Sequence, residues 1–192
     1  MNFKKIKAMK MIKEEYDDLS KNNINTSYMT ISVGLVNQDN IFEWKIAIIG
    51  PKDTSYKGGI FSVIIKFPEN YPEKAPDVFF KTPVYHVNIN PFKVNIKGVE
   101  SLGHAYINIL NDWKPETKMK DVFEHIHNLF FSVDLNSPYI FDKEEEIKYN
   151  RPVYEEKIKC FTKKYANPHK ANLKYDIDWD FSSPEIGLKK IY

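Results

Sequence analysis

Cysteine is nearly absent from this sequence, since Cys160 is the only one among its 192 residues. An internal disulfide is therefore excluded, and a reducing compartment suits the chain, although other compartments are compatible with so few cysteines. Long apolar runs are also missing, because none approaches the roughly 18 residues that a membrane helix needs and no signal-peptide core is visible. We expect no membrane span and a location in the cytoplasm, the nucleus or both.

An excess of charge of one sign is missing too. The 28 lysines and arginines stand against 26 acidic residues, which gives a net charge of +2. The overall charge therefore provides no argument for binding to nucleic acid or to a membrane surface. Lysines nevertheless crowd the amino terminus, where a charged helix face could bind an acidic partner but is more often only solvated.

The amino-acid composition is that of a folded globular protein. Apolar residues make up 42%, aromatic residues 15% and charged residues 28% of the chain. The length suits one domain with a sizeable core. We predict a domain over residues 1–166 and a C-terminal extension over residues 167–192 that either packs on the domain or binds a partner. No cofactor and no metal site are expected.

Four segments have the features of helices: residues 2–19, residues from about Met119 to the Asn136-Ser137-Pro138 stretch, residues 142–150 and residues 152–166. The first has apolar side chains at helical spacing up to Leu19, with its lysines largely on other faces. The last begins at Pro152, which a helix tolerates in its first turn.

Between the first two helices the apolar period changes to two. Residues 42–48 and 61–67 each place alternate apolar side chains on one face, as neighbouring antiparallel strands do. A strand near Thr30 and a short one over residues 77–81 complete a four-stranded antiparallel meander. Prolines recur between Pro68 and Pro91, which predicts a long ordered segment with little regular structure. The expected fold class is α+β.

A series of short motifs runs along this pattern: Phe42-Glu43-Trp44, Gly50-Pro51-Lys52-Asp53-Thr54, Tyr56-Lys57-Gly58-Gly59-Ile60-Phe61, Phe67-Pro68-Glu69-Asn70-Tyr71-Pro72, Tyr85-His86 and Trp113-Lys114-Pro115. Their order and spacing resemble those of ubiquitin-conjugating (E2) enzymes. The resemblance covers roughly residues 5–166. It implies the UBC fold, with an N-terminal helix, a four-stranded meander, a long active-site segment and C-terminal helices.

The departure from the family lies where its chemistry would be. His86-Val87-Asn88 stands in place of the family's His-Pro-Asn, and an insertion around residues 91–102 follows. Gly103 then fixes the register, which puts Tyr106 at the position of the family's nucleophilic cysteine. Because an E2 carries ubiquitin as a thioester, it needs a thiolate. A tyrosine hydroxyl is bulky and scarcely ionised at neutral pH, so we expect no catalytic residue.

Other site residues are judged from the same resemblance. It makes Asn88 the former stabiliser of the oxyanion and His86 a member of the motif. Without a thioester, we expect Asn88 to hold its loop together through hydrogen bonds to the backbone. Cys160 lies late in the last predicted helix, where we expect a small packing residue and not a nucleophile.

Partner binding in the family uses a basic first helix and two loops. The resemblance therefore makes six residues candidates for partner binding: Lys4, Lys5, Lys7, Glu73, Trp113 and Glu116. The two glutamates stand where the loops of many members offer apolar contacts. They weaken the case for ordinary engagement of RING or HECT ligases.

Three functions are compatible with the sequence. The leading hypothesis is a catalytically inactive E2-like protein that acts as a binding or scaffold subunit. Its partners would be ubiquitin or a ubiquitin-like protein, and an active E2 enzyme or a ligase or adaptor complex. The first alternative is a divergent active conjugating enzyme that forms a thioester. The second is a trafficking adaptor without ubiquitin contact, because residues 131–138 and the extension faintly resemble proteins of the Fused Toes (Akt-interacting protein) type.

Overall fold

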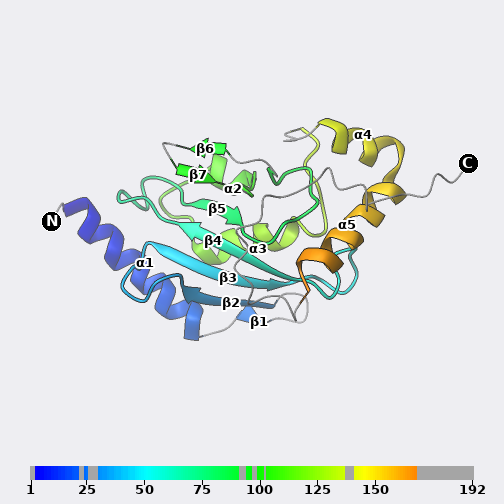
Figure 1. Ribbon diagram of the computed structural model, residues 1–192. Helices are drawn as coiled ribbons and strands as arrows, with labels where there is room; N and C mark the ends of the chain where they lie inside the picture. Colours follow the sequence, from blue (N-terminus) through cyan, green and yellow to red (C-terminus); the bar gives the residue numbers. More distant parts are fainter. Residues whose placement is uncertain are drawn as a thin grey trace, which may run out of the picture.

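A long helix, an antiparallel sheet and a set of further helices follow one another along the chain (Figure 1). The computed structural model describes residues 3–21, 24–25, 30–90, 94–96, 99–101, 103–136 and 141–167. Helix α1 (Phe3–Lys21) lies at one end of the molecule, and helices α4 (Phe141–Tyr149) and α5 (Arg151–Tyr165) lie at the other. This arrangement is the predicted α+β order.

The sheet has the strand order β1-β2-β3-β4-β5, and every neighbouring pair is antiparallel. Its strands are β1 (Ile24–Asn25), β2 (Thr30–Leu35), β3 (Glu43–Ile49), β4 (Ile60–Lys66) and β5 (Asp77–Phe80). Trp44 lies opposite Ile65, and Ile48 lies opposite Phe61. All four side chains are fully buried, because a period of two directs alternate residues to the core. The predicted four-stranded meander is confirmed, and the short β1 adds an unpredicted fifth strand.

Helix α1 packs through Ala8, Ile12 and Leu19, which confirms the predicted amphipathic helix. Glu15 connects it to two other parts of the fold: one carboxylate oxygen accepts the Tyr71 hydroxyl at 2.5 Å and the other accepts the Met119 N–H at 2.7 Å. Burial, followed by this hydrogen bond, raises the pKa of Tyr71 far above its ordinary value. Glu15 therefore connects α1 to the loop after β4 and to the next long helix.

That helix, α3 (Met119–Asn128), is shorter than predicted. We expected it to continue to the Asn136-Ser137-Pro138 stretch, and this was wrong. After Asn128 the backbone tightens into turns, in which the Phe130 N–H donates to His127 and the Phe131 N–H donates to Asn128. Phe130 is buried, whereas the neighbouring Phe131 is half exposed. The apolar side chains in this stretch thus reach the core from turns. The helices predicted near 142–150 and 152–166 are confirmed as α4 and α5.

Two elements were not predicted. Helix α2 (Asn108–Asn111) is a single turn, and the insertion contains an antiparallel hairpin of β6 (Val94–Ile96) and β7 (Val99–Ser101). The hairpin is drawn beyond β5, on the side of the sheet opposite β1 (Figure 1). The rest of the insertion and residues 168–192 of the predicted extension lie outside the described residues. None of the helices in the described ranges is long and apolar enough to cross a membrane.

Candidate functional site

Residues 103–106 form a short extended segment between β5 and residues 88–90. On one side, the Phe80 N–H donates to the Gly103 carbonyl at 2.8 Å and the Ala105 N–H donates to the Val78 carbonyl at 3.1 Å. On the other side, the Tyr106 N–H donates to the Asn88 carbonyl at 2.8 Å. Gly103 enters this segment with φ of 77°, a conformation that glycine adopts without strain. The backbone at Tyr106 is therefore fixed from both sides.

Asn88 is fully buried, and its side chain forms two hydrogen bonds to the backbone of the turn after α3. Its Nδ2 donates to the Asp134 carbonyl at 2.7 Å, and its Oδ1 accepts the Asp134 N–H at 2.8 Å. A buried carboxamide that uses its donor and its acceptor on one residue acts as a clasp between two distant segments. With this geometry Asn88 holds the two segments together, and its amide points at the Asp134 backbone.

His86 is buried beside this clasp. Its Nδ1 accepts the Asn88 N–H at 3.0 Å, so the ring proton lies on Nε2, which donates to the Leu129 carbonyl at 2.8 Å. Burial lowers the pKa of His86 to about 4. The hydrogen bond to Leu129 opposes this effect, and the nearby Lys143 adds to it. The ring is thus neutral near pH 7, with both nitrogens engaged, and is not available as a general base.

A cavity of about 410 Å³ lies in front of Tyr106. Its walls come from residues 73–77, 104–107, 110–111 and 113. Tyr106 is partly buried there, and His104 lies with its ring centre 5.3 Å from that of Phe79. Burial lowers the pKa of His104, against the opposing charge of Asp77. The Tyr106 phenol and the His104 imidazole line the cavity. The thiol of Cys160 does not, because this residue is exposed on α5.

Comparison with known proteins identifies the family. Residues 11–162 match the family model described as "Ubiquitin-conjugating enzyme". The chain belongs to the ubiquitin-conjugating enzyme family. It is 36% identical over 132 residues to the "Probable ubiquitin-conjugating enzyme E2 31" of Arabidopsis thaliana, a match that covers 68% of this chain and 79% of the relative. It is 30% identical over 155 residues to the "Ubiquitin-conjugating enzyme E2 14" of the same plant, across 79% of this chain and 90% of the relative.

Membership of the family implies interaction with ubiquitin and with an activating enzyme or a ligase. It also confirms the UBC fold that the motifs implied. The alignment of Tyr106 with the family's cysteine rests on the sequence motifs and stays a prediction. Among the described residues, no group of histidine, cysteine, aspartate and glutamate side chains could hold a metal ion.

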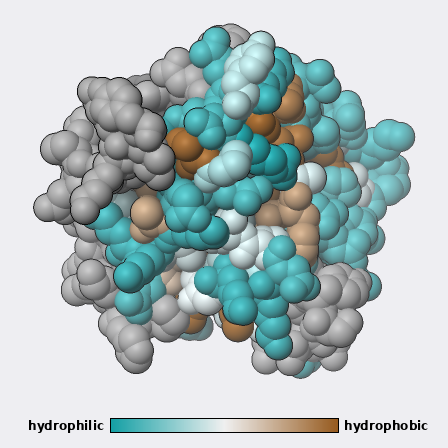
Figure 2. Space-filling model, turned by 90° about the vertical axis from the view of Figure 1, so that its right-hand side faces the viewer, coloured by the Kyte–Doolittle hydropathy of each residue, from teal (hydrophilic) through white to brown (hydrophobic). Residues whose placement is uncertain are grey.

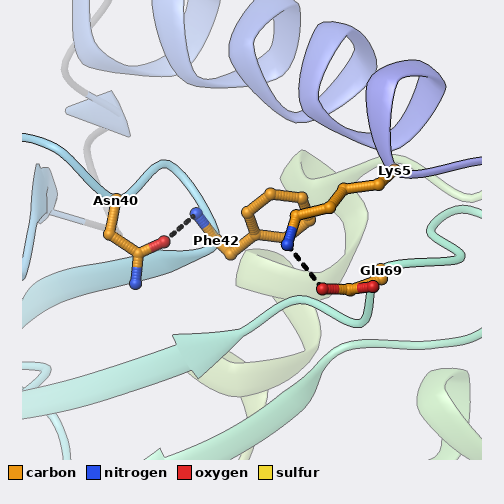
Figure 3. A network of polar contacts seen from close by, with 4 residues as sticks. All are labelled: Lys5, Asn40, Phe42 and Glu69. Carbon is orange, nitrogen blue, oxygen red and sulfur yellow. Dashed lines mark hydrogen bonds and ion pairs between the residues drawn. The ribbon is translucent and has the colours of Figure 1, made fainter. Parts of the chain in front are cut away.

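Two of the α1 lysines that we predicted to bind a partner protein contact the loop between β4 and β5 of the same chain. Lys5 extends across the Phe42 ring, 5.7 Å from its centre, to an ion pair of 2.5 Å with Glu69 (Figure 3). Lys7 pairs with Glu73 at 2.9 Å, and this bond lowers the pKa of Glu73. The structure thus brings Lys5, Lys7 and Glu73 together on one surface, with much of their charge compensated internally.

The other three predicted partner-binding residues have different surroundings. Trp113 is partly buried, and its Nε1 donates to the Pro72 carbonyl at 2.6 Å, so it supports the loop that carries Glu73. Glu116 is exposed in the turn before α3, and Lys4 is exposed on α1. Trp113 therefore stabilises the fold through its hydrogen bond to Pro72, whereas the exposed side chains of Lys4 and Glu116 are accessible to a partner.

A charged cluster around the buried Lys143 connects helices α4 and α5 to the site, and no pattern in the sequence predicted it. Lys143 of α4 is buried, donates to the His86 carbonyl at 3.4 Å and lies 4.4 Å from the centre of the Tyr85 ring. The Tyr85 hydroxyl donates to Glu146 at 2.8 Å, and Glu146 also pairs with Lys157. Burial lowers the pKa of Lys143 to about 7, although Glu146 opposes this shift. A lysine in a highly charged helix normally indicates an exposed side chain.

Cys160 was expected to pack in the core, and this was wrong. It is exposed, because α5 directs Ile158, Phe161 and Tyr165 inward and position 160 falls on another face of the helix. Its exposure makes it the accessible thiol of the chain, but it does not line the cavity at Tyr106.

The Asn88 clasp leads to a first prediction. We expect Asn88→Ala to lower the free energy of unfolding by about 2–3 kcal/mol, because both backbone groups of Asp134 lose their partner. Denaturant unfolding followed by circular dichroism measures the loss, and hydrogen exchange at the Asp134 amide should speed up. Asn108→Ala is the control, since Asn108 is exposed and its substitution should change stability by less than about 0.5 kcal/mol. Equal losses in the two variants would contradict the clasp.

The buried neutral His86 predicts a dependence of stability on pH. A histidine in the unfolded chain binds its proton near pH 6.5, whereas folded His86 binds it at about pH 4. The unfolded state therefore holds more protons between these values, so this contribution is complete above pH 6.5 and is lost as the pH falls toward 4. The loss should reach about 3 kcal/mol. Denaturant unfolding between these limits should give a steeper pH dependence for the native chain than for His86→Gln, and equal slopes would refute the assignment.

Proposed function

We propose that this member of the E2 family does not carry ubiquitin as a thioester and serves as a binding or scaffold subunit in the ubiquitin system. The single observation that carries the proposal is Tyr106 in the motif register of the nucleophilic cysteine. A phenol is a poor substitute for a thiolate, because it ionises far above neutral pH and needs a base to attack an acyl group. The proposed location is the cytoplasm, the nucleus or both.

The surroundings of Tyr106 support this proposal. The nearby His86 is neutral, with one nitrogen bonded to Leu129 and the other to Asn88. The Asn88 amide is bonded to Asp134 and points at that backbone. An oxyanion donor has to aim at the place where the charge develops, so an amide committed elsewhere contributes little to acyl transfer. Tyr106 is therefore a weak nucleophile, and His86 and Asn88 are both committed to other contacts.

The names of the two relatives favour a second candidate. Both are described as ubiquitin-conjugating enzymes, at 36% and 30% identity. A divergent active enzyme would need another nucleophile, and Cys160 is the only thiol in the chain. Its place on the exposed face of α5, apart from the cavity at Tyr106, disfavours that role.

A charging assay distinguishes the two candidates. With activating enzyme, ATP and ubiquitin, we expect the native chain to form no thiol-sensitive adduct. Tyr106→Cys combined with Cys160→Ser should form one, because the backbone at position 106 is held by main-chain hydrogen bonds that survive the substitution. Non-reducing gels with and without dithiothreitol provide the measurement.

Single substitutions serve as controls in that assay. A thiol-sensitive adduct on the native chain that disappears in Cys160→Ser would contradict the proposal and identify Cys160 as the nucleophile. An adduct that resists thiols, is cleaved by hydroxide and disappears in Tyr106→Phe would also contradict it, because Tyr106 would then carry ubiquitin as an ester.

The scaffold role makes a separate prediction. When the ¹⁵N-labelled chain is titrated with ubiquitin and with an active E2 enzyme, at least one of them should shift a localised set of amide signals. Native chain and Tyr106→Phe should respond alike, since binding does not need the phenol hydroxyl. The absence of shifts with both partners would contradict a role in the ubiquitin system and leave the trafficking adaptor.

A further inference from the structure

A second cavity, of about 450 Å³, lies between the loop that precedes β4 and the last turns of α5. Thr54, Ser55, Lys57 and Gly58 line it from the loop, and Lys159 and Lys163 line it from the helix. The end of the molecule that carries α4 and α5 is mainly hydrophilic, with only scattered hydrophobic areas (Figure 2). No residue of the cavity at Tyr106 takes part, so this is a separate site.

The charge around this cavity is positive. Three lysines line it, and none of the described residues that line it is acidic. Lys159 pairs with Glu156 at 2.6 Å on the surface of α5. Lys57 and Lys163 have no side-chain partner among the residues that the structure describes. Two ammonium groups on opposite walls of a hollow, without a carboxylate partner in the part of the chain that the structure describes, attract an anion and repel each other when the hollow is empty.

Hydrogen bonds keep the two walls in place. The Ile60 N–H donates to the Ala166 carbonyl at 2.8 Å, which joins the end of the loop to the end of α5. Within the loop, Thr54 Oγ1 donates to the Pro51 carbonyl at 2.9 Å, and the Lys57 N–H donates to the Thr54 carbonyl at 3.1 Å. The cavity is therefore formed before any ligand arrives, which reduces the entropy that binding has to overcome.

The loop also leaves donors accessible. Gly58 has φ of 80°, and a Cβ added there would meet no atom within 4 Å, so the backbone borders open space. The Ser55 hydroxyl has no partner in the described part of the chain. A hydroxyl and two ammonium groups that approach from different sides suit a group with several acceptor oxygens.

We propose that this cavity binds the phosphate of a phosphorylated serine or threonine in a partner protein. A phosphate monoester carries nearly two negative charges at neutral pH, which matches the two uncompensated lysines, and three strong acceptor oxygens. The cavity is far larger than one phosphate, so it has room for the flanking peptide. Nucleotides fit less well, because none of the lining residues in the described ranges is aromatic and could stack on a base.

The test uses the full chain and two short peptides of one sequence, Gly-Ser-Gly blocked at both ends, with and without phosphate on the serine. We expect the phosphorylated peptide to shift the ¹⁵N amide signals of Ser55, Lys57 and Gly58, and the unphosphorylated one to leave them unchanged. Lys57→Gln with Lys163→Gln should weaken binding by about tenfold. Both lysines are exposed, so the variant should fold like the native chain, and its thermal unfolding checks this.

Lys45→Gln with Lys81→Gln is the matched control, because it removes two positive charges from exposed positions away from the cavity. It should weaken binding by less than about twofold, through long-range charge alone. Equal weakening by the two pairs would overturn the site. Equal shifts with both peptides, or with neither, would overturn phosphate recognition. Inorganic phosphate that binds as tightly as the phosphopeptide would overturn the assignment to a partner protein.

Discussion

The pair of hydrogen bonds between the Asn88 carboxamide and the backbone of Asp134 is the contact on which the arrangement of residues 84–90 depends. It joins two segments that lie far apart in the sequence, and the bond from His86 to Leu129 joins the same two segments once more. In both contacts one partner is a main-chain group. In these two contacts, positions 86 and 88 contribute side chains and the turn after α3 contributes main-chain groups.

The segment around residues 84–90 is fastened on its other sides as well. Its main chain bonds to residues 103–106, which in turn bond to β5, so the site is continuous with the sheet edge. From the other direction, Lys143 of α4 reaches the His86 carbonyl and covers the Tyr85 ring. A buried lysine is costly to desolvate, and here a carboxylate, an aromatic face and a carbonyl offset that cost. The C-terminal helices are thus part of what positions the site.

The sequence predicted the parts of the fold that have a strong period. Trp44 and Phe61 lie on buried faces, because side chains alternate between the two faces of a strand and the apolar ones face the core. Leu19 lies in the core because helical spacing puts it on the apolar stripe. The end of α3 was missed because its apolar residues continue past Asn128 while the backbone turns. Lys143 and the partner of Asn88 were missed because they depend on contacts between segments distant in sequence, which no local pattern records. Gly103 has a positive φ, a conformation that glycine adopts without strain and that side chains disfavour.

The structure separates what the fold needs at this site from what the chemistry needs. Position 106 contributes its N–H to the fold, and every amino acid except proline supplies that group. His86 and Asn88 contribute buried side chains whose removal would leave polar groups without partners. A chain of this family that had lost its nucleophile would therefore be free to change residue 106 while still needing residues 86 and 88. His86 and Asn88 have contacts that the fold uses, so their presence does not by itself argue for retained catalysis.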